Sequence, residues 1–468
     1  MLLLTALLPY LLLTSAHPHH SRSPHARRSL LGELSAHASI DLTLLPTRQF
    51  SECLEDRQEW LHEQTDTLLH KYAALIDESW EKNTSLVKKD VGVAQLTDVN
   101  YDASYLGTVH IGTPPQELLL VLDTGSADLW AAGADCANCG DGDRFSPSAS
   151  STYQASSGTF SITYGSGSAS GDLGTDLVEL ANFTVPNITF AVVDQASSGL
   201  ISAPLSGIMG LAFSGLSNAQ ATPWWETLVD AGRWDSPEFG VYLARYRNDP
   251  SASTVEGDGG AITFGGIDTT KFTGELNYVP INDSARDYWR IPLEGLTINN
   301  HTVNIAPSSS SSTLPAWLQP LNPFLPQNST SDPPQACIDT GTTLIGAPPS
   351  TVQAIYAQIP GSSPLPPWII GGQGLWQYPC SQNVSALFQF GGQQYSMSNT
   401  DMNLGPFTSD SSMCTGAFFE MQMSSNSPIQ WIVGASFLKN VYTSFRNTPT
   451  AIGFAPLVLN AASNSTTA

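Results

Sequence analysis

The stretches LLLVLDTGS (residues 118–126) and ACIDTGT (residues 336–342) decide the fold, because each places the triplet Asp-Thr-Gly after an apolar run. Average composition predicts roughly 0.1 such triplets in a chain of 468 residues. Each is followed at similar distance by an apolar-apolar-Gly step, Ile208-Met209-Gly210 in the first case and Ile432-Val433-Gly434 in the second. We infer a body made of two related halves.

An aspartate at the end of an apolar strand, followed by Thr-Gly, places a carboxylate on a tight turn with little water around it. A single such aspartate is most simply a turn residue. Two related turns that face each other are different, because two close carboxylates cannot both ionise at low cost and share one proton. The ionised member can then deprotonate a water while the protonated member donates to a carbonyl oxygen. The sequence therefore predicts amide hydrolysis by Asp123 and Asp339, without a metal or cofactor.

The composition excludes several classes of protein. Apolar residues make up 41% of the chain and charged residues only 13%, which is too little charge for a disordered protein. The formal net charge of −23 argues against nucleic acid as a partner. Residues 90–468 hold nine basic against thirty acidic residues, so acid creates little positive self-repulsion there. This charge distribution suits an acidic medium, with plain solubility as the alternative interpretation.

The N-terminal region predicts two processing steps. Residues 1–16 have the pattern of a secretory signal peptide, with an apolar run too short to span a bilayer and small residues at its end. Residues 17–89 are expected to be a partly helical prosegment, because apolar residues recur at helical spacing and the dibasic pair Lys88-Lys89 follows. No later run has transmembrane length, so we expect no membrane association. Extracellular residence is favoured, with the vacuole as the alternative.

From about residue 90 the pattern changes to short β-rich runs separated by glycine and paired turn residues. We expect an N-terminal lobe over residues 90–275 and a C-terminal lobe over residues 276–468. A Ser/Pro-rich insertion at residues 306–335 is expected to be exposed. Glycosylation sequons fit the secretory route and occur at Asn83, Asn182, Asn187, Asn282, Asn300, Asn328, Asn383 and Asn464.

Six cysteines are few for this length, so disulfides are not expected to build the fold. Cys136 and Cys139 have the spacing of a redox or zinc motif. The body contains no second such pair and only two histidines, so a small structural disulfide is favoured over a metal site. Cys380 and Cys414 are expected to close a loop worth about 3–4 kcal/mol in the chain-entropy model. Cys337, between Ala and Ile, is expected to lie in a buried strand.

The body resembles the pepsin-like aspartic proteases, and fungal members in particular, from about residue 102 to residue 457. The matching runs are YLGTVHIGTPPQ, LDTGSADLW, FSITYGSGSASG, GIMGLAF, AITFGGID, CIDTGTTLI and WIVGASF. The resemblance implies an all-β, bilobal fold that binds an extended peptide between its lobes, preceded by the prosegment of a zymogen. It also implies protein or peptide substrates, inhibition by pepstatin-type compounds and a monomeric enzyme.

The resemblance further implies roles for individual residues. Asp123 and Asp339 match the catalytic pair. The remaining matches comprise residues that contact substrate, the β-hairpin flap that closes over it, and residues that support the carboxylates or the flap. Substrate contacts are implied for Tyr164, Gly165, Ser166, Gly125, Gly341 and Thr342, and support for Ser126, Thr124, Thr340 and Trp130.

Two other kinds of protein could carry the same motifs. A catalytically inactive relative that only binds its partner would share the fold. Such relatives usually lack an aspartate or the flap tyrosine, whereas this chain has Asp123, Asp339 and Tyr164. A half-enzyme that must dimerise is excluded because both triplets lie in one chain. We expect cleavage between large apolar residues and poor cleavage after Lys, since Ser166 stands where some fungal relatives have Asp.

Overall fold

The computed structural model describes residues 91–164, 167–247, 249–282, 286–305, 332–365, 374–406, 411–424 and 426–458. The expected signal peptide and prosegment lie outside the described residues. So do residues 306–331, most of the expected insertion, and the flap residues Gly165 and Ser166.

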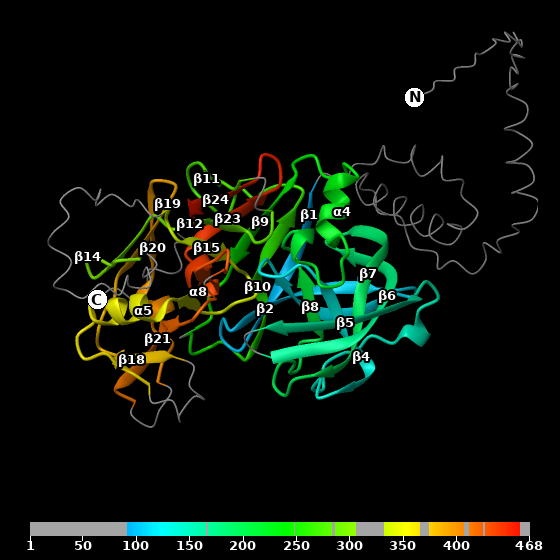
Figure 1. Cartoon of the computed structure of the whole chain (residues 1–468), viewed down its shortest axis with the longest axis horizontal. Helices are drawn as coiled ribbons and strands as arrows, with labels where there is room; N and C mark the ends of the chain where they lie inside the picture. The colour runs from blue at the N-terminus through cyan, green and yellow to red at the C-terminus, as the bar shows by residue number, and fades with distance from the viewer. Residues whose placement is uncertain are drawn as a thin grey trace, which may run out of the picture. The chain divides into compact units, whose positions relative to one another are not determined.

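The expected β-rich fold is confirmed, because the described residues form three sheets and only short helices (Figure 1). The largest has 13 strands in the order β11-β24-β23-β9-β10-β1-β2-β3-β8-β4-β7-β6-β5. Its strands are β1 (Gly92–Val99), β2 (Ser104–Ile111), β3 (Gln116–Asp123), β4 (Leu129–Ala137), β5 (Gln154–Tyr164), β6 (Gly167–Leu180), β7 (Phe183–Ala196), β8 (Gly207–Gly210), β9 (Glu238–Leu243), β10 (Val255–Phe264), β11 (Asn277–Pro280), β23 (Val441–Arg446) and β24 (Ala451–Pro456).

The other two sheets belong to the second half of the chain. The seven-stranded sheet has the order β12-β15-β22-β16-β21-β18-β17 and the four-stranded sheet the order β14-β13-β19-β20. The strands are β12 (Arg290–Pro292), β13 (Gly295–Ile298), β14 (His301–Thr302), β15 (Gln335–Ile338), β16 (Ile345–Ala347), β17 (Ser363–Pro364), β18 (Leu375–Pro379), β19 (Ala386–Phe390), β20 (Gln393–Met397), β21 (Met413–Glu420) and β22 (Trp431–Val433).

The described residues contain four short α-helices, α4 (Trp224–Asp230), α5 (Pro349–Tyr356), α7 (Asn399–Met402) and α8 (Ala435–Leu438), and two 3-10 turns, η3 (Pro147–Ala149) and η4 (Ser214–Leu216). None of these helices has the length and apolar character that a bilayer crossing requires.

The largest sheet joins the two halves of the described chain. Strand β23, near the C-terminus, pairs with β9 from the first half, with Thr443 opposite Val241. An aromatic cluster covers this junction: the rings of Phe239 and Phe445 stack at 5.0 Å, and the ring of Trp289 lies 5.3 Å from that of Phe445. All three side chains are fully buried. The two halves are therefore held together by continuous strand pairing and a shared core.

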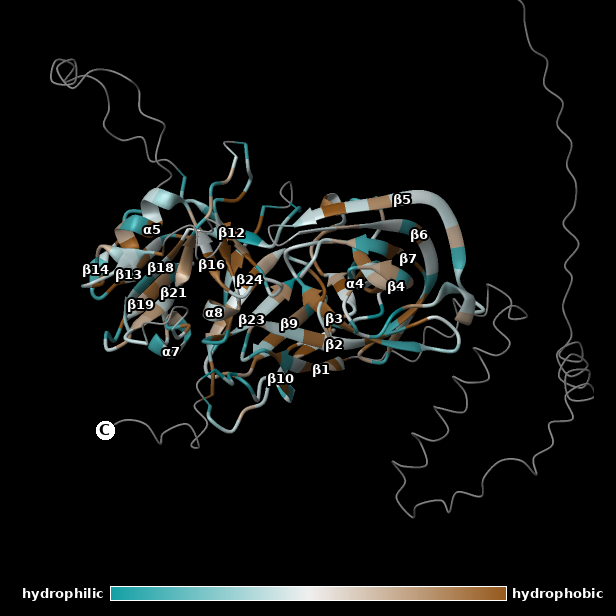
Figure 2. Ribbon diagram, turned by 90° about the horizontal axis from the view of Figure 1, so that it is seen from below, coloured by the Kyte–Doolittle hydropathy of each residue, from teal (hydrophilic) through white to brown (hydrophobic). Residues whose placement is uncertain are grey.

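The β5–β6 hairpin extends from this sheet. In Figure 2 it arches over the first half of the described chain, and its free end points toward the second half. Most of β5 is exposed and only Phe160 and Ile162 are buried in it. Strand β5 forms the edge of the sheet, whereas β6 is paired with β7 and has seven buried residues.

Candidate active site

Each aspartate lies at the end of a buried strand whose neighbour carries the predicted apolar-apolar-Gly step. Strand β3 runs parallel to β8, which places Asp123 opposite Gly210. Strand β15 runs parallel to β22, and the backbone N–H of Asp339 donates to the carbonyl of Val433 at 3.0 Å. The sequence repeat thus corresponds to two structurally equivalent strand pairs. A parallel pair buried on both faces explains why the flanking residues are almost all apolar.

The two Asp-Thr-Gly turns are locked together by their threonines. The backbone N–H of Thr124 donates to the Thr340 hydroxyl at 3.0 Å, and the reciprocal bond from Thr340 to Thr124 is 2.9 Å long. Each hydroxyl also donates across the interface, Thr124 to the carbonyl of Ile338 at 2.8 Å and Thr340 to that of Leu122 at 2.6 Å. Both threonines are buried. This symmetric set of four bonds fixes the two turns face to face.

The two carboxylates have matching hydrogen-bond partners. Asp123 accepts from the backbone N–H of Gly125 at 2.8 Å and from the Ser126 hydroxyl at 2.5 Å. Asp339 accepts from the backbone N–H of Gly341 at 2.8 Å and from the Thr342 hydroxyl at 2.6 Å. In each pair the N–H bonds Oδ1 and the hydroxyl bonds Oδ2. The structure therefore brings Ser126 and Thr342 to equivalent positions.

The glycines of the two turns show how closely the carboxylates approach. A Cβ added to Gly125 would lie 2.6 Å from Oδ2 of Asp339, and one added to Gly341 would lie 2.3 Å from Oδ1 of Asp123. Real Cβ atoms essentially never lie under 3.0 Å from another heavy atom, so only glycine is accommodated at either position. Each carboxylate thus packs against the backbone of the opposite turn.

Burial and mutual repulsion govern the electrostatics of the pair. The exposed fractions of Asp123 and Asp339 are 6% and 7%. Burial, followed by the charge of Asp339, raises the pKa of Asp123 well above its usual range. The hydrogen bond from Ser126 opposes this but is a smaller effect. Two buried carboxylates this close cannot both ionise at low cost, so a single proton is shared between them.

The aromatic residues expected at the flap come together beside this pair. Tyr164 ends β5 and pairs with Gly167 across the hairpin. The indole N–H of Trp130, which is fully buried, donates to the Tyr164 hydroxyl at 2.8 Å. Burial, and then the charge of Asp123, raises the pKa of Tyr164, so its ring lies in the electrostatic field of the carboxylates.

The structure contains both expected disulfides, Cys136–Cys139 and Cys380–Cys414. Cys337 lies in β15 as expected, is 1% exposed and carries a free thiol. Cys337 precedes Asp339 by two residues. Burial raises the pKa of the Cys337 thiol well above its usual range. The thiol therefore packs within the strand that precedes Asp339.

Several residues that position the site were not identified from the sequence. The buried carboxylate of Asp128 accepts four hydrogen bonds from Ser217, Asn218 and Ala219, which fixes this loop beside the first turn. Thr343 extends the second turn with a bond of 2.5 Å from its hydroxyl to the carbonyl of Ala103. The sequence offered one hint of the second contact, a further Thr directly after Asp-Thr-Gly-Thr.

Known proteins are similar to this chain over most of its length. The model of the family described as eukaryotic aspartyl protease matches residues 104–457. The chain is 50% identical over 436 residues to major aspartyl peptidase 1 of Cryptococcus neoformans var. grubii, covering 90% of this chain and 85% of that protein. It is 33% identical to pepsin A of Sus scrofa over 365 residues, which cover 76% of this chain and 83% of that pepsin. It is 32% identical to pepsin A of Bos taurus over 365 residues, which cover 76% of this chain and 86% of that pepsin.

Proposed function

Because the chain belongs to the eukaryotic aspartyl protease family and is a pepsin-like acid endopeptidase, we propose that Asp123 and Asp339 are its catalytic pair. The observation that carries this assignment is the symmetric arrangement of two buried carboxylates. Each packs against the glycine of the other turn and accepts from an N–H and a hydroxyl of its own turn.

The chemistry requires one ionised and one protonated carboxylate in the pair. The ionised member removes a proton from a water molecule, whose oxygen attacks the peptide carbonyl carbon. The protonated member donates to the carbonyl oxygen, so a tetrahedral diol forms without a covalent enzyme intermediate. The first carboxylate then passes its proton to the amide nitrogen while the second takes a proton from one diol hydroxyl, so the C–N bond breaks and an acid and an amine are released. The hydroxyls of Ser126 and Thr342 hold the carboxylates in orientation throughout these steps.

We assign Tyr164, Gly165 and Ser166 to the flap that covers bound substrate, with Trp130 supporting the tyrosine. Substrate side chains are expected to be large and apolar on both sides of the scissile bond. Leu205 and Ile208 pack with Tyr164 and Trp130 in one apolar cluster. Desolvating an apolar side chain against such a surface contributes about 1.5–3 kcal/mol, whereas burying an unpaired ammonium is costly.

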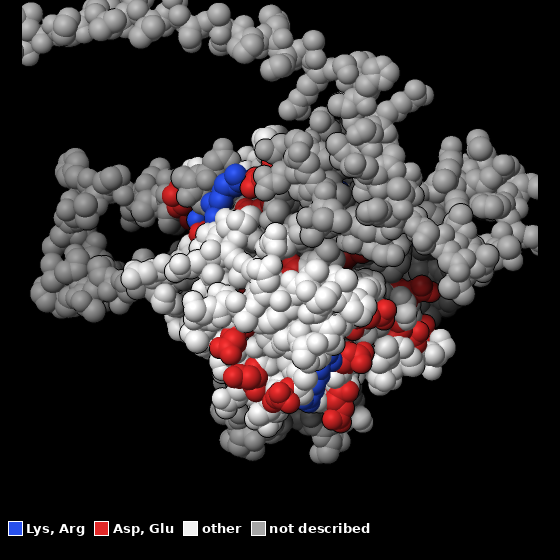
Figure 3. Space-filling model, turned by 90° about the vertical axis from the view of Figure 1, so that its right-hand side faces the viewer, with Lys and Arg blue, Asp and Glu red and all other residues white. Residues whose placement is uncertain are grey.

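We also propose that the enzyme is a secreted, monomeric glycoprotein made as a zymogen, with lobes over residues 90–275 and 276–468. All sequon asparagines within the described residues (Asn182, Asn187, Asn282, Asn300 and Asn383) are exposed, as glycan attachment requires. On the face shown in Figure 3, Asp and Glu outnumber Lys and Arg. Such a surface gains little positive charge in acid and supports work at low pH.

The decisive experiment replaces each carboxylate separately. Asp123→Asn and Asp339→Asn are expected to abolish casein cleavage at pH 3–4, because either change removes the acid or the base. Asp194→Asn, at an exposed position of β7, is the matched control and should cleave like wild type, with pepstatin blocking both. Substantial turnover by a folded Asp123→Asn or Asp339→Asn enzyme would refute the assignment. An inactive wild type would support a protein that only binds.

A further inference from the structure

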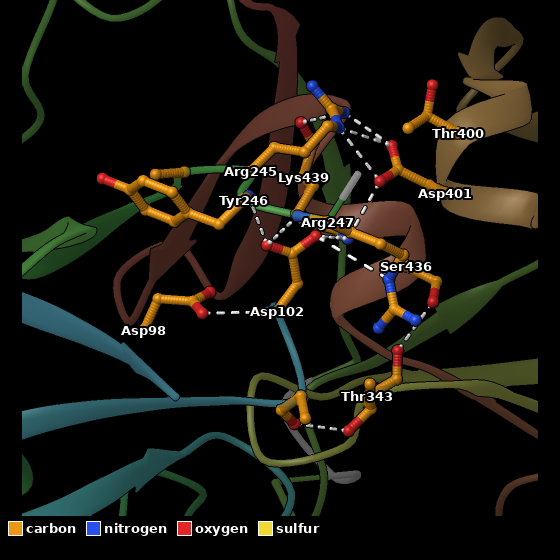
Figure 4. Close-up of polar contacts among 12 residues, drawn as sticks. Asp98, Asp102, Arg245, Tyr246, Arg247, Thr343, Thr400, Asp401, Ser436 and Lys439 are labelled. Carbon is orange, nitrogen blue, oxygen red and sulfur yellow. Dashed lines mark hydrogen bonds and ion pairs between the residues drawn. The ribbon is translucent and has the colours of Figure 1, made fainter. Parts of the chain in front are cut away.

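Figure 4 shows a buried cluster of charged side chains that includes neither of the two aspartates Asp123 and Asp339. The ammonium of Lys439 contacts Oδ2 of Asp102 at 2.6 Å and Oδ1 of Asp401 at 2.9 Å, and the guanidinium of Arg245 contacts Asp401 at 2.5 Å. Asp102 and Asp401 are fully buried, and Lys439 is 2% exposed. We call these four residues the ion cluster. Residues 90–468 contain one other lysine, Lys271. Burying the Lys439 ammonium carries a desolvation penalty that the two carboxylates must offset.

The ion cluster ties together segments that are far apart in the sequence. Asp102 lies in the turn between β1 and β2, and Arg245 follows β9. Asp401 belongs to α7, and Lys439 directly follows α8. The cluster thus fixes the end of α8 relative to the β1–β2 turn.

The β1–β2 turn depends on these contacts for its conformation. Asn100, Tyr101 and Asp102 have φ values of 57°, 57° and 67°, a left-handed conformation that side chains other than glycine adopt at a cost. The Asp102 carboxylate accepts from the backbone N–H groups of Tyr246 at 2.6 Å and Arg247 at 3.2 Å, in addition to Lys439. The next residue in the chain is Ala103.

Thr343 lies between the two segments that the ion cluster fixes. Its hydroxyl donates to the carbonyl of Ala103 at 2.5 Å. Its own carbonyl accepts from the backbone N–H of Ser436 at 2.9 Å and from the Ser436 hydroxyl at 2.8 Å, both at the start of α8. Thr343 directly follows Thr342, whose hydroxyl bonds Asp339. The turn that carries Asp339 is therefore clamped between the β1–β2 turn and α8.

The first half of the chain has no equivalent clamp among its described residues. The residue that corresponds to Thr343 is Ala127, which has no hydroxyl. The first turn is supported instead by Asp128, whose partners at residues 217–219 belong to the same half. The contact from Thr343 to Ala103 joins residues 240 apart in the sequence, so it links the Asp339 turn to the opposite half.

We propose that Thr343 is a positioning residue for Asp339, and that the ion cluster centred on Lys439 is the anchor that keeps Thr343 in place. The inference rests on the proposed catalytic role of Asp339. A small shift of the turn matters because Gly341 abuts Asp123, so the spacing of the two carboxylates changes with it. Misplacing a catalytic group by about 1 Å costs on the order of 100-fold in rate.

The test uses Thr343→Val, which removes the hydroxyl while keeping the shape of the side chain, and Thr343→Ser, which keeps the hydroxyl. Activity on a fluorogenic peptide at pH 4 is divided by the concentration of active sites, obtained by titration with pepstatin. Thr343→Val should lower kcat by about 10- to 100-fold and change the pH dependence of kcat, because the spacing of the two carboxylates changes with the turn. Thr343→Ser should recover most of the kcat.

A second pair of variants tests the anchor. Lys439→Met should lower kcat in the same way as Thr343→Val, and Lys439→Arg should recover it because the guanidinium can pair with the same carboxylates. Lys271→Met, at the other lysine, is the control and should match wild type. If Lys439→Met does not fold, Arg245→Met tests the anchor in its place, because it removes the partly exposed guanidinium that pairs with Asp401; a folded Arg245→Met enzyme with wild-type kcat would overturn the anchor.

The outcomes separate this inference from the proposed function. A folded Thr343→Val enzyme with wild-type kcat would overturn the positioning role. A Lys439→Met enzyme that folds and keeps its kcat would overturn the anchor. A wild-type protein without peptidase activity would instead refute the catalytic assignment on which both rest.

Discussion

Replacing Asp98 by Asn should remove a large pH-dependent loss of stability from this protein. Asp98 lies in β1 and is fully buried. One of its oxygens accepts from the backbone N–H of Asp102 at 2.9 Å, while the other has no hydrogen-bond partner. Burial raises the pKa of Asp98 from 3.8 to about 6, and the nearby charge of Asp102 adds to the effect. Asn resembles the protonated side chain and does not ionise.

The magnitude follows from the two pKa values. Below pH 3.8 the carboxyl is protonated in both the folded and the unfolded chain, and above about 6 it is ionised in both. Between these values the folded state holds the proton more tightly. Stability from this group is therefore fully present below pH 3.8 and is lost as the pH rises through about 6. At roughly 1.4 kcal/mol for each pH unit, the loss amounts to about 3 kcal/mol.

The assay is urea unfolding of wild type and Asp98→Asn at several pH values between 3.5 and 7, the range in which the change is expected. Both proteins carry Asp123→Asn, which prevents self-digestion. The difference in unfolding free energy should change by about 3 kcal/mol across this range in favour of Asp98→Asn. Contributions from groups that do not interact with Asp98 are common to both proteins and cancel. Asp194→Asn, at an exposed carboxylate, is the control and should follow wild type.

A constant offset between the two curves would reflect only the altered packing and hydrogen bonding of the amide. The pH-dependent part is the prediction. If the difference between Asp98→Asn and wild type stays the same from pH 3.5 to pH 7, the carboxyl ionises normally in the folded state and the reasoning from burial is wrong.

Three further predictions concern catalysis. Gly341→Ala should lower kcat about 100-fold, as expected for a displaced catalytic group, because its Cβ would lie 2.3 Å from Asp123. Gly257→Ala, which has open space around it, is the control, and equal activity of the two variants would contradict the close packing. The purified precursor should be inactive at pH 7 and lose its leader at pH 4, because the histidines of the leader become charged as the pH falls through about 6.5. The mass of the protein is followed at both pH values, and equal activity at both with the leader still attached would refute self-inhibition. A peptide-library digest should show few cuts after Lys, and Ser166→Asp should gain them; frequent cuts after Lys by wild type would mean that another carboxylate lines the pocket.

The sequence by itself predicted the β-rich fold, which is confirmed, and the proposed catalytic pair. Asp123, Asp339 and their glycines are recognisable because a tight turn after a buried strand requires an apolar run followed directly by particular turn residues. These residues are adjacent in the sequence and form a short motif, and the duplication of this motif indicates the two halves. The buried strand position of Cys337 was likewise predictable from its apolar neighbours, since burial within a strand depends on local pattern. Roles of Gly165 and Ser166 remain predictions, because these residues lie outside the described structure.

Only the tertiary structure revealed how the centre is held. Asp102 and Lys439 are 337 residues apart, and nothing in the neighbourhood of either predicts that they meet. The same holds for the contact from Thr343 to Ala103 and for the raised pKa of Asp98. Local patterns report the interactions of a residue with its neighbours in the chain. The pairing of buried charges and the loss of water around a carboxyl depend on which distant segments pack together, and that is decided when the two halves fold against each other.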